Sequence, residues 1–260
     1  MSAILTSIAT DDSPARELDT TADYRDSHAE RGGDYDARIA ATPFDAYLAR
    51  VEAAHLEEVF RDVIPQPIGR SLDFACGTGR IAVQVEPHVH EAYGVDVSAS
   101  MLEQARRKCR WTVFIEADIT RERLSCGPFD VVTAFRFFGN AQDDLRTAAL
   151  RAIHDLLVPG GFLVLNNHRN PSTFSSWLHR ASGGVEERDL THSKLGRQLE
   201  EAGFRVVRRR AIGFWIYRSK LAVHGLDGVD ATSARERWFA HAVFAPWAPD
   251  AILVAQKASS

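Results

Sequence analysis

Cysteine and long apolar runs are scarce in this 260-residue sequence, and each scarcity excludes a class of protein. The three cysteines, Cys76, Cys109 and Cys126, are an odd number without metal-ligand spacing, so we expect neither a disulfide framework nor a metal site. No apolar run is long enough to span a bilayer. The first residues lack the basic and apolar regions of a secretory signal and are too acidic for a transit peptide, so we expect a cytoplasmic location.

An excess of positive charge is also missing. The formal net charge is −4, which provides no general attraction to nucleic acid or to an anionic membrane. Hydrophobic residues make up 45% and charged residues 25%, an ordinary globular composition, and the length suits one large domain with an appended cap. Residues 1–22 are small, polar and acidic, and we expect a disordered leader there, followed by the domain over residues 23–260.

Apolar segments and helical patterns alternate along that domain. The pattern predicts strands at 71–74, 92–97, 112–117, 129–135, 162–165, 204–207 and 251–255, and helices at 44–63, 80–86, 100–108, 143–157 and 193–202. Pro159-Gly160-Gly161 is expected to end the fourth of these helices and to turn the chain into the next strand. This order indicates an α/β fold, a Rossmann-like sheet of seven mostly parallel strands with helices on both faces. The aromatic-rich stretch 213–249 is expected to be a small substrate cap.

The stretch from Ser71 to Arg80 has the layout of a nucleotide-binding loop, a buried strand that runs into a turn with two glycines. Gly77 and Gly79 allow a ligand to approach the main chain, and the helix behind them offers unpaired N–H groups. The run Gly77-x-Gly79-x-x-Ala82 fits the loose dinucleotide pattern. However, the Asp73 carboxylate would repel a pyrophosphate, whereas it suits a ligand that carries an ammonium and a sulfonium.

Four segments together resemble the motifs of class I S-adenosylmethionine-dependent methyltransferases of the small-molecule type. They are Asp73-Phe74-Ala75-Cys76-Gly77-Thr78-Gly79, Tyr93-Gly94-Val95-Asp96-Val97-Ser98, Phe114-Ile115-Glu116-Ala117-Asp118-Ile119 and the turn from Leu156 to Leu165. The resemblance implies S-adenosyl-L-methionine as cofactor. It also implies a set of cofactor-binding residues: Asp73, Ala75, Cys76, Gly77, Gly79, Arg80, Asp96, Val97, Met101, Asp118, Ile119, Phe135 and Tyr35.

Several of these residues have a second interpretation. In the family, the acid at Asp96 takes the ribose hydroxyls and the acid at Asp118 meets the adenine amine, but both acids could instead cap the helix or turn that follows them. Cys76 is favoured as a small apolar filler over a reactive thiol. Tyr35 could close over the cofactor or lie in a solvated loop.

The residues after the fourth and fifth strands would face the transferred methyl group. His168 is the candidate general base, because histidine titrates near neutral pH and the run from Asn166 to Asn170 is too polar for a buried strand interior; the alternative is a histidine that binds a backbone carbonyl. Arg136 and Arg169 could hold an anionic substrate or pair with pocket acids. The arginines at 205 and 208–210 are favoured as a solvated face that protects an edge strand.

These features predict methyl transfer to an oxygen or nitrogen of a small-molecule acceptor, such as a sugar, a polyketide or a similar metabolite. No nucleic-acid or membrane partner is expected. An RNA or protein methyltransferase, a nicotinamide-dependent oxidoreductase and a non-catalytic binding protein stay as alternatives. The sequence specifies no oligomeric state.

Overall fold

The computed structural model describes residues 43–168, 170–183, 189–212 and 245–259. The expected leader, Tyr35, Arg169 and most of the expected cap lie outside the described residues. Within the described part, no helix is both long enough and apolar enough to cross a membrane.

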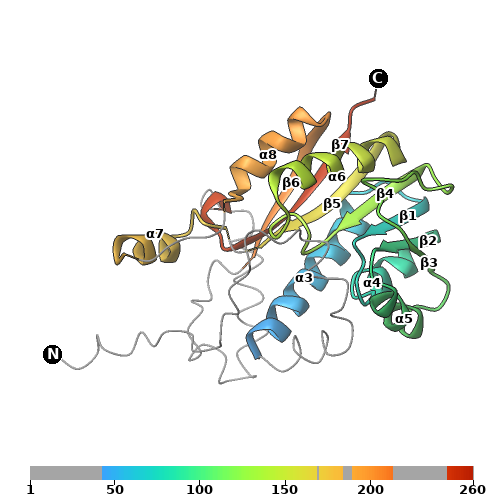
Figure 1. Ribbon diagram of the computed structural model, residues 1–260, viewed down its shortest axis with the longest axis horizontal. Helices are drawn as coiled ribbons and strands as arrows, with labels where there is room; N and C mark the ends of the chain where they lie inside the picture. The colour runs from blue at the N-terminus through green and yellow to red at the C-terminus, as the bar shows by residue number, and fades with distance from the viewer. Residues whose placement is uncertain (1–42, 169, 184–188, 213–244, 260) are drawn as a thin grey trace.

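Seven strands form one sheet in the order β3-β2-β1-β4-β5-β7-β6 (Figure 1). They are β1 (Ile68–Phe74), β2 (Val89–Asp96), β3 (Val113–Glu116), β4 (Phe129–Ala134), β5 (Leu157–Asn167), β6 (Phe204–Ile212) and β7 (Asp250–Lys257). β1 to β5 pair in parallel, and β7 is antiparallel to both of its neighbours. The expected mostly parallel, seven-stranded sheet is therefore confirmed. The strand order reverses between β1 and β4, where an open α/β sheet leaves a crevice at its carboxyl edge.

Helices cover both faces of the sheet. They are α3 (Pro43–Asp62), α4 (Ala82–Val85), α5 (Ala99–Lys108), α6 (Asp143–Leu156), α7 (Phe174–Ala181) and α8 (His192–Glu201), with short 3-10 turns η1 (Glu86–His88) and η4 (Ala245–Trp247). α6 and α8 pack on one face, and α3 and α4 on the other (Figure 1). The Ser98 and Thr191 side chains cap α5 and α8 by accepting the N–H groups of Met101 and Lys194, which explains why these helices begin there.

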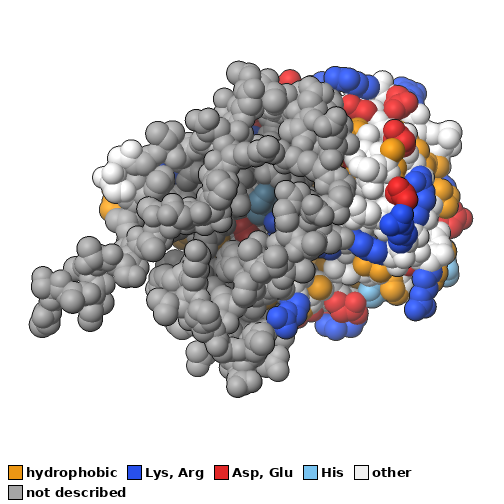
Figure 2. Space-filling model, turned by 60° about the horizontal axis from the view of Figure 1, so that its bottom comes forward, with side chains coloured by type: hydrophobic (Ala, Val, Ile, Leu, Met, Phe, Trp, Pro, Cys, Tyr) orange, Lys and Arg blue, Asp and Glu red, His pale blue; other side chains and the backbone are white. Residues whose placement is uncertain are grey.

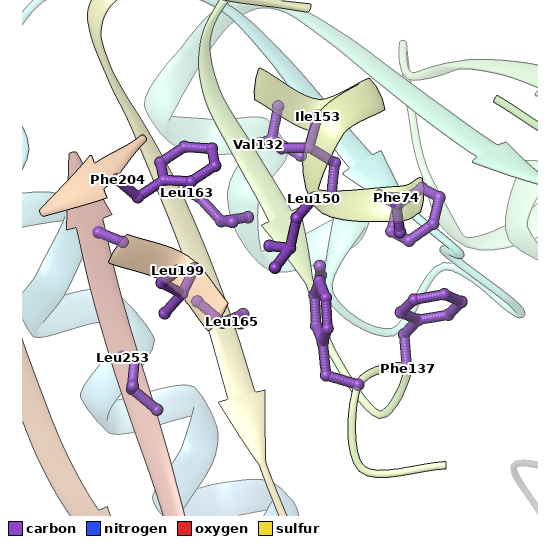
Figure 3. Close-up of a cluster of buried hydrophobic side chains, with 14 of the residues drawn as sticks. Phe74, Val132, Phe137, Leu150, Ile153, Leu163, Leu165, Leu199, Phe204 and Leu253 are labelled. Carbon is purple, nitrogen blue, oxygen red and sulfur yellow. The ribbon is translucent and has the colours of Figure 1, made fainter. Parts of the chain in front are cut away.

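The larger core lies between the sheet and the helices α6 and α8. Leu150 and Ile153 project from α6 onto Leu163 and Leu165 of β5, and Leu199 of α8 joins the same cluster (Figure 3). These side chains recur at helical spacing on α6 and at alternate positions on β5, as expected for one buried face of each element. The cluster anchors the strands whose ends form the crevice.

The course of β5 differs from the expectation at both of its ends. Pro159-Gly160-Gly161 does not precede the strand: β5 begins at Leu157, and the three residues form an irregularity in its pairing with β4, with Gly160 at φ 76°. Asn166 and Asn167 were expected to be too polar for a buried strand, yet they are its last two residues and are buried. Both side-chain NH2 groups are paired, because Asn166 donates to Glu52 at 2.7 Å and Asn167 to the Leu190 carbonyl at 2.9 Å.

The arginine run lies on β6, an edge strand, as expected. Arg205, Arg208 and Arg209 are exposed, whereas Arg210 is buried and lies 4.0 Å from Glu58. On the face drawn in Figure 2, basic and acidic side chains are interspersed over the described surface. The strands β5 and β7 separate the run from β4.

Truncation of a core side chain on α6 should destabilise the whole sheet. Leu150 is 1% exposed, so Leu150→Ala should lower the free energy of unfolding by about 2–5 kcal/mol through lost burial and a residual cavity. Urea denaturation followed by circular dichroism measures the change. The neighbouring exposed Arg151→Ala is the control and should alter stability by no more than about 0.5 kcal/mol. Equal effects of the two substitutions would contradict this account of the core.

Candidate active site

A pocket opens at the carboxyl ends of β1, β2 and β4, at the position where the strand order reverses. Of the predicted cofactor residues that the structure describes, all line it except Gly79. The lining also contains Phe74, Thr78, Ile81, Val95, Ala117, Thr120, Arg136, Phe137, Asn140 and Leu145. The pocket therefore extends from the glycine loop to the segment that follows β4.

The two loop glycines have different functions in the structure. Gly77 has φ 53°, and a Cβ atom there would meet nothing within 4 Å, so the backbone is open to a ligand. Gly79 has φ 76°, and a Cβ atom would lie 2.9 Å from the Ala105 Cβ, so glycine is required there for packing against α5. Ala75 also has a positive φ of 52°, a conformation that costs a non-glycine residue roughly 1 kcal/mol. The loop is thus held in one shape by its helix and by its own backbone.

Asp73 is a buried acid at the end of β1, next to the glycine loop. Its Oδ1 accepts the Thr133 hydroxyl of β4 at 2.7 Å, and its Oδ2 has no hydrogen-bond partner within the described residues. Burial raises the pKa of the Asp73 carboxyl group to about 7, although the Thr133 hydrogen bond and the Arg80 charge lower it. A buried acceptor without a hydrogen-bond donor destabilises the protein. A ligand that places a cation or a donor beside Asp73 Oδ2 would remove this destabilisation.

Asp96 connects the end of β2 to the glycine loop. Its Oδ2 accepts the Gly77 N–H at 2.8 Å, and its Oδ1 accepts the Ser98 N–H at 3.0 Å. The cap of α5 is the Ser98 side chain, so the alternative of Asp96 as the helix cap does not apply. Asp96 instead fixes the loop and lines the pocket beside it.

Asp118 follows β3, and its position is compatible with both interpretations considered for it, a turn cap and an acid of the cofactor pocket. Its Oδ1 accepts the Thr120 N–H at 3.0 Å, so it does cap the local turn. It also lines the pocket together with Ile119. Turn capping therefore holds this carboxylate at the pocket wall.

The Cys76 thiol is buried in the loop. Burial raises its pKa well above the usual range, and the nearby Asp73 and Asp96 charges act in the same direction. The thiol packs with Ala82, Leu102 and Ala105. A protonated thiol in such surroundings is a small apolar side chain and a poor nucleophile, in agreement with the favoured interpretation.

The far wall of the pocket is the segment after β4. Phe137 is held edge-to-face against Phe74 of β1, with ring centroids 4.7 Å apart. Arg136 has φ 62°, and its N–H donates to the Asn166 side chain at 2.6 Å while its carbonyl accepts from Asn140 at 2.7 Å. Sequence reasoning placed Phe137 in the segment that faces the methyl group without a role of its own. It missed Glu52, the buried acid of α3 that contacts Arg136 and Arg80. An acidic residue amid apolar helical positions was the available signal for Glu52.

His168 lies directly behind that wall. It is 7% exposed, and its ring lies against Gly139, where an added Cβ would meet the His168 Cε1 and Nδ1 atoms at 3.0 Å. It is not part of the pocket lining itself, although Phe137, two residues before this glycine, and Asn140, directly after it, are. Its function as a general base stays a prediction.

The raised pKa of Asp73 predicts a specific pH dependence of stability. The unfolded carboxyl loses its proton near pH 3.8 and the folded one near 7, so unfolding releases a proton between these values and the free energy of unfolding falls as the pH rises. Asp73→Asn should abolish this loss and be more stable than the unmodified protein at pH 8, by up to about 4 kcal/mol.

Urea denaturation of both proteins at pH 5 and pH 8, without ligand, measures the difference. The advantage of Asp73→Asn should be small at pH 5 and larger at pH 8. A less stable variant at pH 8 would contradict a strained, buried carboxylate at this position.

Comparisons with known proteins agree with this arrangement. Residues 72–161 match the family model described as a methyltransferase domain. The chain is 25% identical over 199 residues to malonyl-[acyl-carrier protein] O-methyltransferase of Enterobacter lignolyticus, covering 74% of this chain and 72% of that one. It is 32% identical over 112 residues to the ubiquinone/menaquinone biosynthesis C-methyltransferase UbiE of Coxiella burnetii, covering 40% of this chain and 44% of that one.

A solved structure extends the likeness at the level of the fold. Magnesium protoporphyrin IX methyltransferase of Synechocystis PCC 6803, solved with bound S-adenosylhomocysteine (SAH), superposes with a TM-score of 0.59 at 15% identity. The match covers 90% of this chain and 97% of that one. The common fold thus includes the strands at the pocket.

The residues of the pocket fit S-adenosylmethionine. Asp73, Asp96 and Asp118 supply acceptors and negative charge, and the cofactor carries an ammonium, a sulfonium, two ribose hydroxyls and an adenine amine. The open backbone at Gly77 leaves room for a ligand beside them. The matched domain, its relatives and this donor set lead to one conclusion: residues 72–161 form a methyltransferase domain, and the chain is an S-adenosylmethionine-dependent methyltransferase.

Proposed function

We propose that this methyltransferase modifies an oxygen or nitrogen of a small-molecule acceptor, such as a sugar, a polyketide or a similar metabolite. The observation that supports the proposal is the composition of the far pocket wall, where the apolar side chains of Phe137 and Leu145 line the pocket next to the cofactor residue Phe135. An apolar wall with a few polar groups suits a compact organic acceptor. The name of the Enterobacter relative, an O-methyltransferase, agrees with an oxygen acceptor.

Charge argues against a nucleic-acid acceptor. None of the arginines of β6 lines the pocket, and β5 and β7 separate that strand from the pocket wall at β4. The pocket itself contains three carboxylates, which would repel a phosphate backbone. A neutral or weakly charged acceptor avoids that cost.

Each strand end has its own proposed role toward the cofactor, which supplies a methyl group already activated by its sulfonium. We assign the ribose hydroxyls to Asp96, the adenine amine to Asp118 with Ile119 against the ring, and the cationic methionine end to Asp73. The wall from Phe135 to Asn140 then excludes water beside the methyl group and orients the acceptor. His168 takes the proton from an acceptor that must lose one as it attacks.

A transfer assay distinguishes the acceptor classes. The protein is incubated with radiolabelled S-adenosylmethionine and, separately, with pooled sugars, phenolic and polyketide-like compounds, small amines, total RNA and a protein extract. Label should enter the small-molecule pools and not the two macromolecular fractions. Stable incorporation into RNA or protein alone would overturn the proposal, and label on a carbon atom would correct the acceptor type.

The role of His168 can be tested once an acceptor is known. His168→Gln should lower kcat by roughly 100- to 10,000-fold because the proton is no longer removed in the transition state. Cofactor affinity, measured by calorimetry, should change by less than about threefold. His154→Gln, on α6 away from the pocket, is the control and should leave kcat unchanged. An unaltered kcat in His168→Gln would refute a general base at this position.

A further inference from the structure

A buried carboxylate of α3 connects two arginines of the pocket. Glu52 is 2% exposed, and its Oε2 lies 2.9 Å from the Arg80 Nη1 and 3.8 Å from the Arg136 Nη2. Its Oε1 accepts the Asn166 side-chain amide at 2.7 Å. One carboxylate thus connects α3, the glycine loop, the segment after β4 and the end of β5.

The same network fixes the backbone that carries Arg136. The Asn166 side chain donates to Glu52 and accepts the Arg136 N–H at 2.6 Å, so a single amide connects the acid to the strained residue. The positive φ of Arg136 needs such support, because a non-glycine residue leaves this conformation when it is not held there. The network therefore fixes the backbone position from which the Arg136 side chain extends.

The pocket wall contains both basic and acidic residues. Arg80 and Arg136 are the basic residues of the lining, and its acids are Asp73, Asp96 and Asp118. S-adenosylmethionine carries one carboxylate in addition to its cationic groups. An anionic group is favoured beside guanidinium groups and disfavoured beside carboxylates, so this end of the cofactor belongs next to the arginines.

We propose that Glu52 is a positioning residue, which holds Arg80 and Arg136 at the pocket wall so that they bind the carboxylate of the cofactor's methionine part. Long arginine side chains lose considerable rotamer entropy when they are fixed. Because ion pairs with Glu52 already order them in the free protein, less entropy is lost when the ligand binds. This inference rests on the cofactor assignment and is independent of the acceptor.

Two ligands distinguish a role of Glu52 in carboxylate binding from a general effect on the stability of the pocket. SAH contains the methionine-derived carboxylate, whereas 5′-methylthioadenosine lacks the amino-acid part. Glu52→Gln should weaken the binding of SAH roughly ten- to a hundredfold in calorimetric titration, because the arginines lose their charged anchor. It should change the Kd of methylthioadenosine by less than about twofold.

A second buried glutamate provides the matched control. Glu86 is 3% exposed, and its carboxylate accepts the backbone N–H groups of Arg110, Trp111 and Thr112 outside the pocket lining. Glu86→Gln should lower the melting temperature without changing the Kd of either ligand. Equal weakening of both ligands by Glu52→Gln, or no weakening, would overturn the proposal.

A double-mutant cycle identifies the side chains through which Glu52 acts. Arg80→Gln and Arg136→Gln should each weaken SAH selectively, and Glu52→Gln should add little in either background. Additive effects would contradict positioning through these arginines. If Glu52→Gln does not fold, the two arginine variants still test the carboxylate site. Binding of SAH by the unmodified protein separates a failure of this inference from a failure of the cofactor assignment.

Discussion

The hydrogen bond between Thr133 and Asp73 is the constraint on which the pocket depends. The two residues lie opposite each other in the parallel strands β4 and β1, and the bond keeps an acid at the reversal point of the sheet, where burial raises its pKa to about 7. A protein without a ligand for this position would gain stability by replacing the acid. Burial of the Asp73 carboxylate therefore destabilises the protein without ligand, and a cationic ligand would offset that destabilisation. This is expected of a binding site that is formed before its ligand arrives.

Polar groups elsewhere at the sheet's carboxyl edge are stabilised by long-range partners. Asn166 and Asn167 end a buried strand because Glu52, on a helix 114 residues earlier than Asn166, and the segment around Leu190 supply their hydrogen bonds. Asp96 and Asp118 bind the backbone of the loop and the turn beside them. The carboxylates of Asp96 and Asp118 are thus held by backbone hydrogen bonds, whereas Asp73 Oδ2 is the one carboxylate oxygen buried without a hydrogen-bond partner among the acids described.

Sequence reasoning predicted most of the fold, because strand and helix periodicity in the parallel part is local information. The glycine loop and the acids at the carboxyl ends of β1, β2 and β3 were predicted for the same reason: each lies at or just after the end of a recognisable buried strand. The course of β5 was not predictable, because its two asparagines are tolerated only through contacts with residues far away in the chain. Glu52 was missed since its helix reads as amphipathic, and only the tertiary structure brings Arg80 and Arg136 to it.

The most direct test of the central claim, that the acids at the strand ends form an S-adenosylmethionine pocket, is calorimetric titration of the purified protein with S-adenosylmethionine, SAH and NADH. Binding of the first two ligands with a Kd on the order of micromolar, and no binding of NADH, is the expected result. Binding of NADH alone would contradict the roles of Asp73, Asp96 and Asp118 as well as the assignment of the family.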